Sequence, residues 1–559
     1  MRISRRAGPA AIVLALLATT CTGSGSAGPS PSSAASGSTV KATGPNVVIL
    51  LSDDQAFRIF DRNLMPNVFS KLVDQGVDFT RAYVNVSQCC PSRSSILTGL
   101  YSHDTGVDSN TVPLDGRVPF RPVFPLALRA AGYRTGLFGK YLNSEPCDPQ
   151  PGWGAWVCTQ DTERNPTLNI NGRIQHTNGY TADILANKAI NFIENRQAAQ
   201  EPFFLYYAPK DPHLPANDDR DKRPVPPYDP PSFNADPNPH SRPAWTRLPP
   251  LSPTDQKLIE DWHTNMTRQI PPLDADMGRI LEALGSQEDD TLVIFMSDNG
   301  FMYGEHRLTS KNQPYEESVR VPLVIRFPSM LPAAKHFSSD ALVSNVDLAP
   351  TIMDAVGIPW EADGTSLLPL LERKVAKVRD GLLLEWCQAG NTDPCQSEKR
   401  GEELNVFNLP HYWGLETDRY AYIEYATGES ELYDLRSDPY ELTNLSGEAS
   451  FAKLKRKLSR QLAALRAPPG APGTTIATGP SGSVPDHQVT FTFFSQSRTT
   501  TLRCSLRGPG HDGSAAPCNS GTITYRSLRN GAYTFTVQAV DARGHPDPTP
   551  ATRPFTIAL

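Results

Sequence analysis

Four short, uninterrupted runs of apolar residues constrain the fold more than any other feature of the sequence. They occupy residues 46–51, 203–207, 291–296 and 321–325. Runs without alternating polar residues are typical of strands buried on both faces of a sheet. Between them lie helical patterns, one of which places Leu185, Ala189 and Ile193 on a single helix face. Alternating strands and helices predict an α/β fold with a mostly parallel central sheet flanked by helices.

Polar residues follow two of these runs directly. Asp53 and Asp54 come after the first, and Asp298 and Asn299 come after the third. Ligands of parallel sheets bind beyond the carboxyl ends of the strands. Three carboxylates and one amide suit a hard divalent cation such as Ca²⁺, which tolerates irregular geometry. An Asp-Asp pair at a strand end is also a common helix cap or turn, but the second pair favours a metal site.

A cysteine motif supplies a candidate nucleophile. The sequence from Cys89 to Gly99 reads CCPSRSSILTG. We expect a helix to begin near Ser92, which places Cys89 at its positive end, where the field favours a thiolate and attracts sulfate or phosphate. Arg93 lies one turn into this helix and can hold the nucleophile or an ester oxygen. The plainer interpretation is that the adjacent cysteines are core or disulfide residues.

Composition and charge narrow the class of protein. The chain has 559 residues and a formal net charge of −6, which leaves room for two to four domains and argues against nucleic-acid binding. Arg2, Arg5 and Arg6 precede a short apolar stretch over residues 10–18, which predicts a signal peptide rather than a membrane span. Cys21 follows it as a candidate lipidation site, so we expect an exported protein, either a cell-surface lipoprotein or secreted.

The organisation of the chain can be predicted from composition shifts. Prolines crowd residues 208–253, which indicates a lid or wall over a cleft, and alternating strands after residue 480 indicate a β-sandwich. The expected parts are a signal peptide over 1–21, a flexible tether over 22–43, a large α/β domain over 44–332, a smaller α+β subdomain over 333–466, a linker over 467–480 and an immunoglobulin- or fibronectin-like β-sandwich over 481–559.

Six of the nine cysteines fall into three close pairs. Small disulfide loops of this kind are typical of exported proteins. The expected pairs are Cys147 with Cys158, Cys387 with Cys395, and Cys504 with Cys518. Cys90 is left without a partner and is expected to be buried.

Several ordered motifs between about residues 45 and 465 carry a family resemblance. The chain resembles type I, formylglycine-dependent sulfatases of the alkaline phosphatase superfamily, with an alkaline-phosphatase-like fold. The form GKYLN at 139–143 is closer to glucosamine-6-sulfatases and heparan endosulfatases than to arylsulfatases. The motifs are LSDD at 51–54, CCPSRSSILTG at 89–99, GLFGKYLN at 136–143, DPHLP at 211–215, SDNG at 297–300, GEH at 304–306, SK at 310–311, PYE at 314–316, VPL at 321–323 and ELYDL at 431–435.

The resemblance implies a nucleophile and a metal site. Only Cys89 fits the C-x-P-S-R frame, because Cys90 would need proline at position 92. A maturation enzyme would convert Cys89 to formylglycine (3-oxoalanine), whose hydrate is both the nucleophile and a ligand of one Ca²⁺. The remaining ligands implied are Asp53, Asp54, Asp298 and Asn299.

The resemblance also implies how sulfate is held. Arg93 would orient the hydrate, while Lys140, His213 and Lys311 would bind the sulfate oxygens, and His213 would protonate the leaving alkoxide. Many arylsulfatases have a histidine where Leu142 stands. Weaker substrate contacts are therefore assigned to His103, Asn143 and His306.

The expected function is hydrolysis of sulfate monoesters of a carbohydrate or small alcohol by an exported sulfuric ester hydrolase. One alternative is a phosphonate or phosphodiester hydrolase of the same superfamily. The other is a catalytically silent surface protein that binds glycans.

Overall fold

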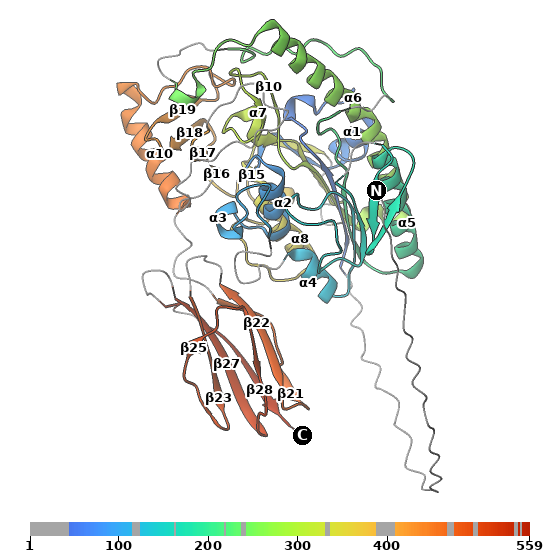
Figure 1. The fold of residues 1–559 in the computed structure, drawn as a ribbon, viewed down its shortest axis with the longest axis vertical. Coiled ribbons are helices and arrows are strands. Elements are labelled where there is room, and N and C mark those ends of the chain that lie inside the picture. Colours follow the sequence, from blue (N-terminus) through green and yellow to red (C-terminus); the bar gives the residue numbers. More distant parts are fainter. Residues whose placement is uncertain are drawn as a thin grey trace, which may run out of the picture. The chain divides into compact units, whose positions relative to one another are not determined.

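The computed structural model describes residues 44–114, 123–160, 164–216, 220–235, 242–329, 336–386, 409–466, 474–495, 501–540, 546–547 and 550–558. A ten-stranded sheet lies at the centre of the large α/β part (Figure 1). Its strands, in spatial order, are β14 (Phe337–Ser339), β2 (Val77–Phe79), β13 (Leu323–Arg326), β9 (Thr291–Ser297), β1 (Asn46–Ser52), β8 (Phe203–Ala208), β4 (Arg134–Gly139), β5 (Ala155–Cys158), β6 (Thr167–Ile170) and β7 (Arg173–His176).

The middle of this sheet is parallel, as the sequence predicts. β1 pairs in parallel with β8 on one side and β9 on the other, and β4 continues the parallel pairing to β5. The fourth apolar run forms β13, which is antiparallel to β9. The sheet is therefore mixed at its edges and parallel where β1 ends. The expected α/β fold with a mostly parallel central sheet is confirmed.

Side chains of β1 alternate between two hydrophobic cores. Val47, Ile49 and Leu51 belong to one core, and Val48 and Leu50 belong to the other. All seven residues of the strand are buried, because helices cover both faces of the sheet. Burial on both faces explains why the run carries no polar alternation.

The helices form two layers (Figure 1). α5 (Thr181–Ala199), α6 (Pro253–Ala283) and α1 (Pro66–Lys71) contribute to the core of Val48. α2 (Cys89–Thr98), α4 (Phe124–Ala130), α8 (Leu348–Ala355) and α9 (Leu368–Leu371) contribute to the core of Val47. Two shorter helices are α3 (Ser102–Thr105) and α7 (Glu316–Val319).

A smaller antiparallel sheet follows the central one. It contains β16 (Leu382–Trp386), β17 (Tyr412–Glu416), β18 (Tyr420–Tyr425) and β19 (Ser430–Asp434), with α10 (Ala452–Leu465) packed on it. Leu383 and Leu432 of the sheet share a core with Leu458 and Leu462 of the helix. There are also two small sheets, of which the first is a local pair and the second joins segments that are distant in the sequence. They are β10 (Met302–Tyr303) with β11 (Thr309–Ser310), and β12 (Arg320–Val321) with β3 (Ala82–Tyr83) and β15 (Val343–Ser344).

Two further sheets form the C-terminal part. They share a core in which the rings of Phe491 and Phe535 stack at 4.0 Å, and Cys504 is bonded to Cys518. The first sheet contains β20 (Thr474–Thr478), β22 (Val489–Ser495) and β26 (Thr522–Tyr525). The second contains β21 (Gly482–Val484), β28 (Ala551–Ile557), β27 (Gly531–Val540), β23 (Thr501–Gly508) and β24 (His511–Asp512), with β25 (Ala516–Pro517) beside β23.

Several predictions fall outside the described residues. These are the signal peptide, the tether, Cys21, Cys387 and Cys395. In the part of the chain that the structure describes, no helix has the length and apolar character needed to cross a bilayer.

Candidate active site

The ends of β1 and β9 bring four predicted metal ligands together. Ser52 is paired with Ser297 in the parallel register, so the two polar pairs leave the sheet side by side. The backbone N–H of Asp54 donates to Asp298 Oδ1 (3.2 Å), and Asn299 Nδ2 donates to Asp54 Oδ1 (2.6 Å). Together with Asp53, these residues are fully buried. We call Asp53, Asp54, Asp298 and Asn299 the strand-end cluster.

The segments after the neighbouring strands β8 and β4 add two basic side chains, His213 and Lys140. After β8, the Asp211 carbonyl oxygen accepts from the Asp53 backbone N–H (3.0 Å), and His213 Nε2 lies 3.5 Å from Asp54 Oδ2. After β4, Lys140 Nζ donates to Asp53 Oδ2 (2.6 Å). Gly139 permits this exit from β4, because its φ is +127° and a Cβ there would lie 2.0 Å from the Ala208 carbonyl oxygen.

Helix α2 brings the candidate nucleophile to the cluster. The helix begins at Cys89, three residues earlier than expected, with Gln88 as its N-cap residue. Cys89 Sγ lies 3.5 Å from Asp53 Oδ1, and Lys311 Nζ lies 3.0 Å from the same sulfur. Lys311 also pairs with Asp54 Oδ1. The carboxylate and the ammonium group thus both reach the cysteine sulfur.

Arg93 ties the helix to the strand ends. It lies one turn after Cys89, and its Nε donates to Asp298 Oδ2 (2.7 Å). Its Nη1 donates to the carbonyl oxygen of Lys140 (2.7 Å). Because Arg93 is fully buried, these charge-assisted bonds fix the relative positions of α2, β9 and the end of β4.

Neighbouring basic side chains set the pKa values of Asp53 and Asp54. Burial alone would raise the pKa of Asp53, but Lys140, His213, Arg93 and Lys311 hold it well below its usual value. The pKa of Asp54 is lowered in the same way, chiefly by Lys311 and His213 against burial. The site therefore keeps these two carboxylates ionised without exposure to water.

The cysteine behaves differently from the expectation of a thiolate. Burial raises the pKa of the Cys89 thiol to about 12, although Lys140 and Lys311 oppose the rise. The field of the helix terminus is thus outweighed by desolvation, and the expectation of a thiolate is wrong for the unmodified residue. Burial also lowers the pKa of His213 to about 4, so this imidazole is neutral at pH 7. Its Nδ1 contacts the Leu214 carbonyl oxygen, so the ring proton lies on Nδ1.

The donor set fits a hard cation. Asp54 Oδ2 and Asn299 Oδ1 are buried and accept no hydrogen bond from the described residues. Asp53, Asp54, Cys89 and His213 each offer an atom within 4.8 Å of the others. Buried carboxylate and amide oxygens without donors are suited to coordinate a divalent cation such as Ca²⁺.

The three weaker candidates lie elsewhere. His103 Nδ1 hydrogen-bonds Glu385 (2.9 Å), and His306 is fully buried, where it stacks on Tyr315 at 4.4 Å. Asn143 lines a cavity beside the segment that follows β4. Sequence reasoning missed Glu385, although it lies near the end of the buried strand β16. The rule that singled out Asp53 and Asp298 does not apply to it, because Glu385 lies within β16, which pairs antiparallel with β17.

Comparison with known proteins decides the family. The family model described as Sulfatase matches residues 45–358, more than half of the chain. The chain belongs to the sulfatase family, whose members are sulfuric ester hydrolases. The model described as N-sulphoglucosamine sulphohydrolase, C-terminal, matches residues 304–468 of this sulfatase. The resemblance stated from the sequence motifs is thus confirmed.

Individual relatives agree with this family. The sulfatase is 30% identical over 461 residues to the N-acetylglucosamine-6-sulfatase of Homo sapiens, covering 72% of this chain and 81% of that protein. It is 33% identical over 364 residues to the extracellular sulfatase SULF-1 homolog of Drosophila melanogaster, covering 60% of this chain but only 32% of the fly protein. The chain therefore spans about a third of the length of that relative.

A solved structure shares the fold. It was determined in complex with its substrate, D-glucosamine-2-N,6-O-disulfate. The TM-score is 0.62 at 24% sequence identity, and the match covers 76% of this chain and 97% of the other. The alkaline-phosphatase-like sheet and its helices account for this similarity.

Proposed function

We propose that this sulfatase hydrolyses sulfate monoesters of a carbohydrate, using formylglycine at position 89 and one Ca²⁺ at the strand-end cluster. The observation that carries the proposal is the environment of Cys89, whose sulfur lies between Asp53 and Lys311. A thiol with a pKa of about 12 is a poor nucleophile at neutral pH. An aldehyde hydrate at this position would supply one hydroxyl that attacks the sulfur atom of the sulfate ester. Its second hydroxyl would later release the sulfate.

The side chains around position 89 suit an anionic substrate. A sulfate monoester repels an incoming oxygen nucleophile, so the site must offset negative charge. In our proposal Lys140 and Lys311 bind the sulfate oxygens, and Arg93 orients the nucleophile. His213 protonates the leaving alkoxide through Nε2. Because the free imidazole is neutral, with its pKa lowered to about 4, this role requires Nε2 to take up a proton when the anionic substrate binds.

The class of substrate rests on the relatives. The human relative is named N-acetylglucosamine-6-sulfatase, and the fly relative is named an extracellular sulfatase. We infer that the substrate is a sulfated carbohydrate and that the protein is exported. Anchoring through a lipid on Cys21, maturation by a formylglycine-generating enzyme, the domain boundaries and substrate contacts by His103 and His306 belong to the same proposal.

Mass spectrometry of the peptide that contains Cys89 tests the nucleophile. The expected mass is that of formylglycine in natively matured, exported protein, with sulfate released from a panel of sulfated sugars. Cys89→Ala should abolish turnover. The matched variant Cys90→Ala should retain the modification and mainly lower stability, because Cys90 is buried and its Sγ lies 3.0 Å from Ser144 Oγ. Full turnover by Cys89→Ala would reject the assignment.

Further assays on the same preparation of the protein distinguish two rival functions. A phosphonate or phosphodiester hydrolase would cleave an aryl phosphonate monoester faster than an aryl sulfate. A silent glycan-binding protein would retain an unmodified thiol at position 89 and release no sulfate. The complete set of buried ligands and cations around Cys89 favours the sulfatase over the silent protein.

A further inference from the structure

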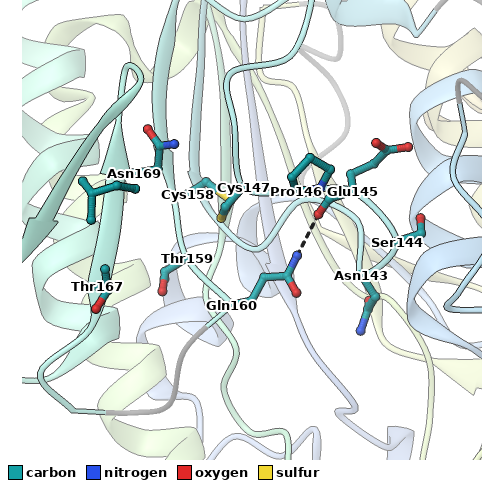
Figure 2. A pocket seen from close by; sticks show the side chains of 11 residues that line it. Asn143, Ser144, Glu145, Pro146, Cys147, Cys158, Thr159, Gln160, Thr167 and Asn169 are labelled. Atoms are coloured by element: carbon teal, nitrogen blue, oxygen red, sulfur yellow. Dashed lines mark hydrogen bonds between the residues drawn. A yellow bond between two sulfur atoms is a disulfide. The ribbon is translucent and has the colours of Figure 1, made fainter.

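A cavity of about 510 Å³ lies between the segment after β4 and the strands β5 and β6 (Figure 2). In Figure 2, Asn143 and Ser144 lie on one side of the cavity, and Thr167 and Asn169 lie on the other. The disulfide of Cys147 and Cys158 lies between the two sides. A cavity of this volume is in the range that holds small organic ligands.

Both sides of the cavity continue from the active site. Asn143 follows Lys140 by three residues, and the carbonyl oxygen of Lys140 accepts from Arg93. On the other wall, the Thr159 N–H donates to the Gly139 carbonyl oxygen (3.3 Å). Ser144 Oγ lies 3.0 Å from the sulfur of Cys90, the residue next to the nucleophile. A substrate that extends beyond one sugar therefore has this cavity as a neighbouring surface.

The lining is polar but carries little charge. The lining offers amide and hydroxyl groups, among them those of Asn143, Thr159 and Gln160. Glu145 is the single ionisable side chain among the described residues that line the cavity. The Asn143 Oδ1 atom is buried and receives no hydrogen bond within the described chain. Amides and hydroxyls can donate to and accept from sugar hydroxyls. A second sulfate or a carboxylate would meet no cation in this lining, and its desolvation would be uncompensated.

The rim supplies an apolar surface. Ile174 lines the cavity and is 65% exposed, although large apolar side chains are usually buried. An exposed aliphatic side chain beside hydrogen-bonding groups complements a sugar ring, which presents C–H faces and hydroxyl edges. The two kinds of surface together indicate a sugar rather than an ion.

We propose that this cavity binds an uncharged sugar ring adjacent to the sugar that carries the scissile sulfate. This inference rests on the proposed function and adds to it the chemistry of the neighbouring residue. The preferred substrate is thus an oligosaccharide with a neutral hexose or N-acetylhexosamine beside the sulfated sugar. A uronate or second sulfate at that position is disfavoured.

Matched substrates test the preference. Two disaccharides carry the same sulfated sugar, linked to a neutral hexose in one and to the corresponding uronic acid in the other. We expect kcat/KM to be at least about tenfold higher for the neutral partner, mainly through KM. Ile174→Lys should reduce this ratio to about one, because the added ammonium attracts the carboxylate. Val375→Lys, at a side chain that is 41% exposed outside the cavity, is the matched control and should leave the ratio unchanged. A preference for the uronate, or an unchanged ratio in Ile174→Lys, would overturn the inference.

A binding experiment separates this inference from the proposed function. Saturation-transfer NMR with the unsulfated neutral disaccharide requires no turnover and uses the full-length Cys89→Ala protein. We expect saturation transfer to the neutral sugar, reduced several-fold when Ile174→Lys is added and unchanged when Val375→Lys is added. Absence of transfer in the parent protein overturns the cavity assignment. Transfer without any sulfate release by the native protein would retain the cavity assignment and reject the proposed function.

Discussion

Two pairs of buried carboxylates, Asp53 with Asp54 and Glu305 with Glu441, have pKa values shifted in opposite directions. In the strand-end cluster, the pKa values of Asp53 and Asp54 lie below their usual values because lysines, Arg93 and His213 outweigh burial. In a second group, burial raises the pKa of Glu305 to about 8 and that of Glu441 well above its usual value. We call Glu305, Glu317, Glu416 and Glu441 the glutamate cluster.

The difference comes from the neighbours of each carboxylate. The further causes of the raised pKa of Glu441 are the nearby carboxylates of Glu316, Glu416 and Glu317. His306, Glu317 and Glu441 also each offer an atom within 4.8 Å of the others. Arg242, however, donates to His306 Nδ1, which places the ring proton on Nε2 and removes the lone pair that a metal needs. The two clusters therefore differ in their charged neighbours: lysines and Arg93 lie beside Asp53, whereas further carboxylates lie beside Glu441.

Metal removal should give the largest contrast between the two clusters. Dialysis against a chelator is expected to abolish sulfate release and to lower Tm by about 2–3 °C, because a cation bound at 100 times its Kd contributes about 2.7 kcal/mol. Added Ca²⁺ should restore both. If chelation changed neither sulfate release nor Tm, the strand-end cluster would hold no metal. It would then not differ from the glutamate cluster in this respect.

Lys311→Met should have the next largest effect. Lys311 Nζ lies 3.0 Å from Cys89 Sγ and pairs with Asp54, so its loss removes a positive charge from the reacting group. We expect kcat to fall about 10²–10³-fold. Glu441→Gln is the matched substitution in the glutamate cluster and should change kcat/KM by less than about threefold. Equal losses of kcat in the two variants would contradict the assignment of Lys311 to the active site.

Glu441→Gln should instead change the pH dependence of stability. A carboxyl whose pKa is raised on folding contributes stability that is present below its unfolded pKa and lost as pH rises through the folded pKa. The wild-type Tm should therefore fall as pH rises above the unfolded pKa of about 4.3. Glutamine mimics the protonated form, so the variant should lose less, by roughly 2–4 °C at pH 9. Parallel Tm curves for the two proteins, measured by differential scanning fluorimetry, would show that Glu441 is not protonated in the fold.

The smallest effect on activity is expected at His103, whose ring lies between the buried carboxylates of Glu385 and Asp104. Burial opposes protonation, but Glu385 raises the pKa of His103 to about 9. Because this pKa is raised above that of the unfolded chain, the stabilisation is complete below about pH 6.5 and is lost as pH rises through 9. It amounts to at most about 3 kcal/mol. His103→Gln should lower Tm at pH 6 and match the wild type at pH 10. A uniform loss at both pH values would indicate packing rather than charge.

The sequence predicts the strand-end cluster better than any other part of the site. Parallel strands 46–51 and 291–296 place Asp53 beside Asp298 whatever the details of the loops, which is why the fold and these neighbours were predictable. The start of α2 was misplaced because every residue from Cys89 to Thr98 is buried, so the helix shows no apolar stripe to mark its first turn.

Other features depend on contacts that sequence patterns do not contain. The protonation of Cys89 follows from complete burial, which competes with the helix terminus and cannot be read from its neighbours in the chain. The glutamate cluster joins residues 305, 317, 416 and 441, whose spacing has no period. The cavity beside Asn143 likewise requires β6 to lie opposite the segment after β4, and this pairing is visible only in three dimensions.

The alternation of β1 between two cores has a consequence for tolerance to substitution. Trimming Val47 disturbs one layer of helices and trimming Val48 disturbs the other, yet both side chains belong to the strand that carries Asp53 at its tip. Damage in either layer should therefore reach the same catalytic position. In a library of core variants, losses of turnover would therefore map to two separate cores, both of which include residues of β1.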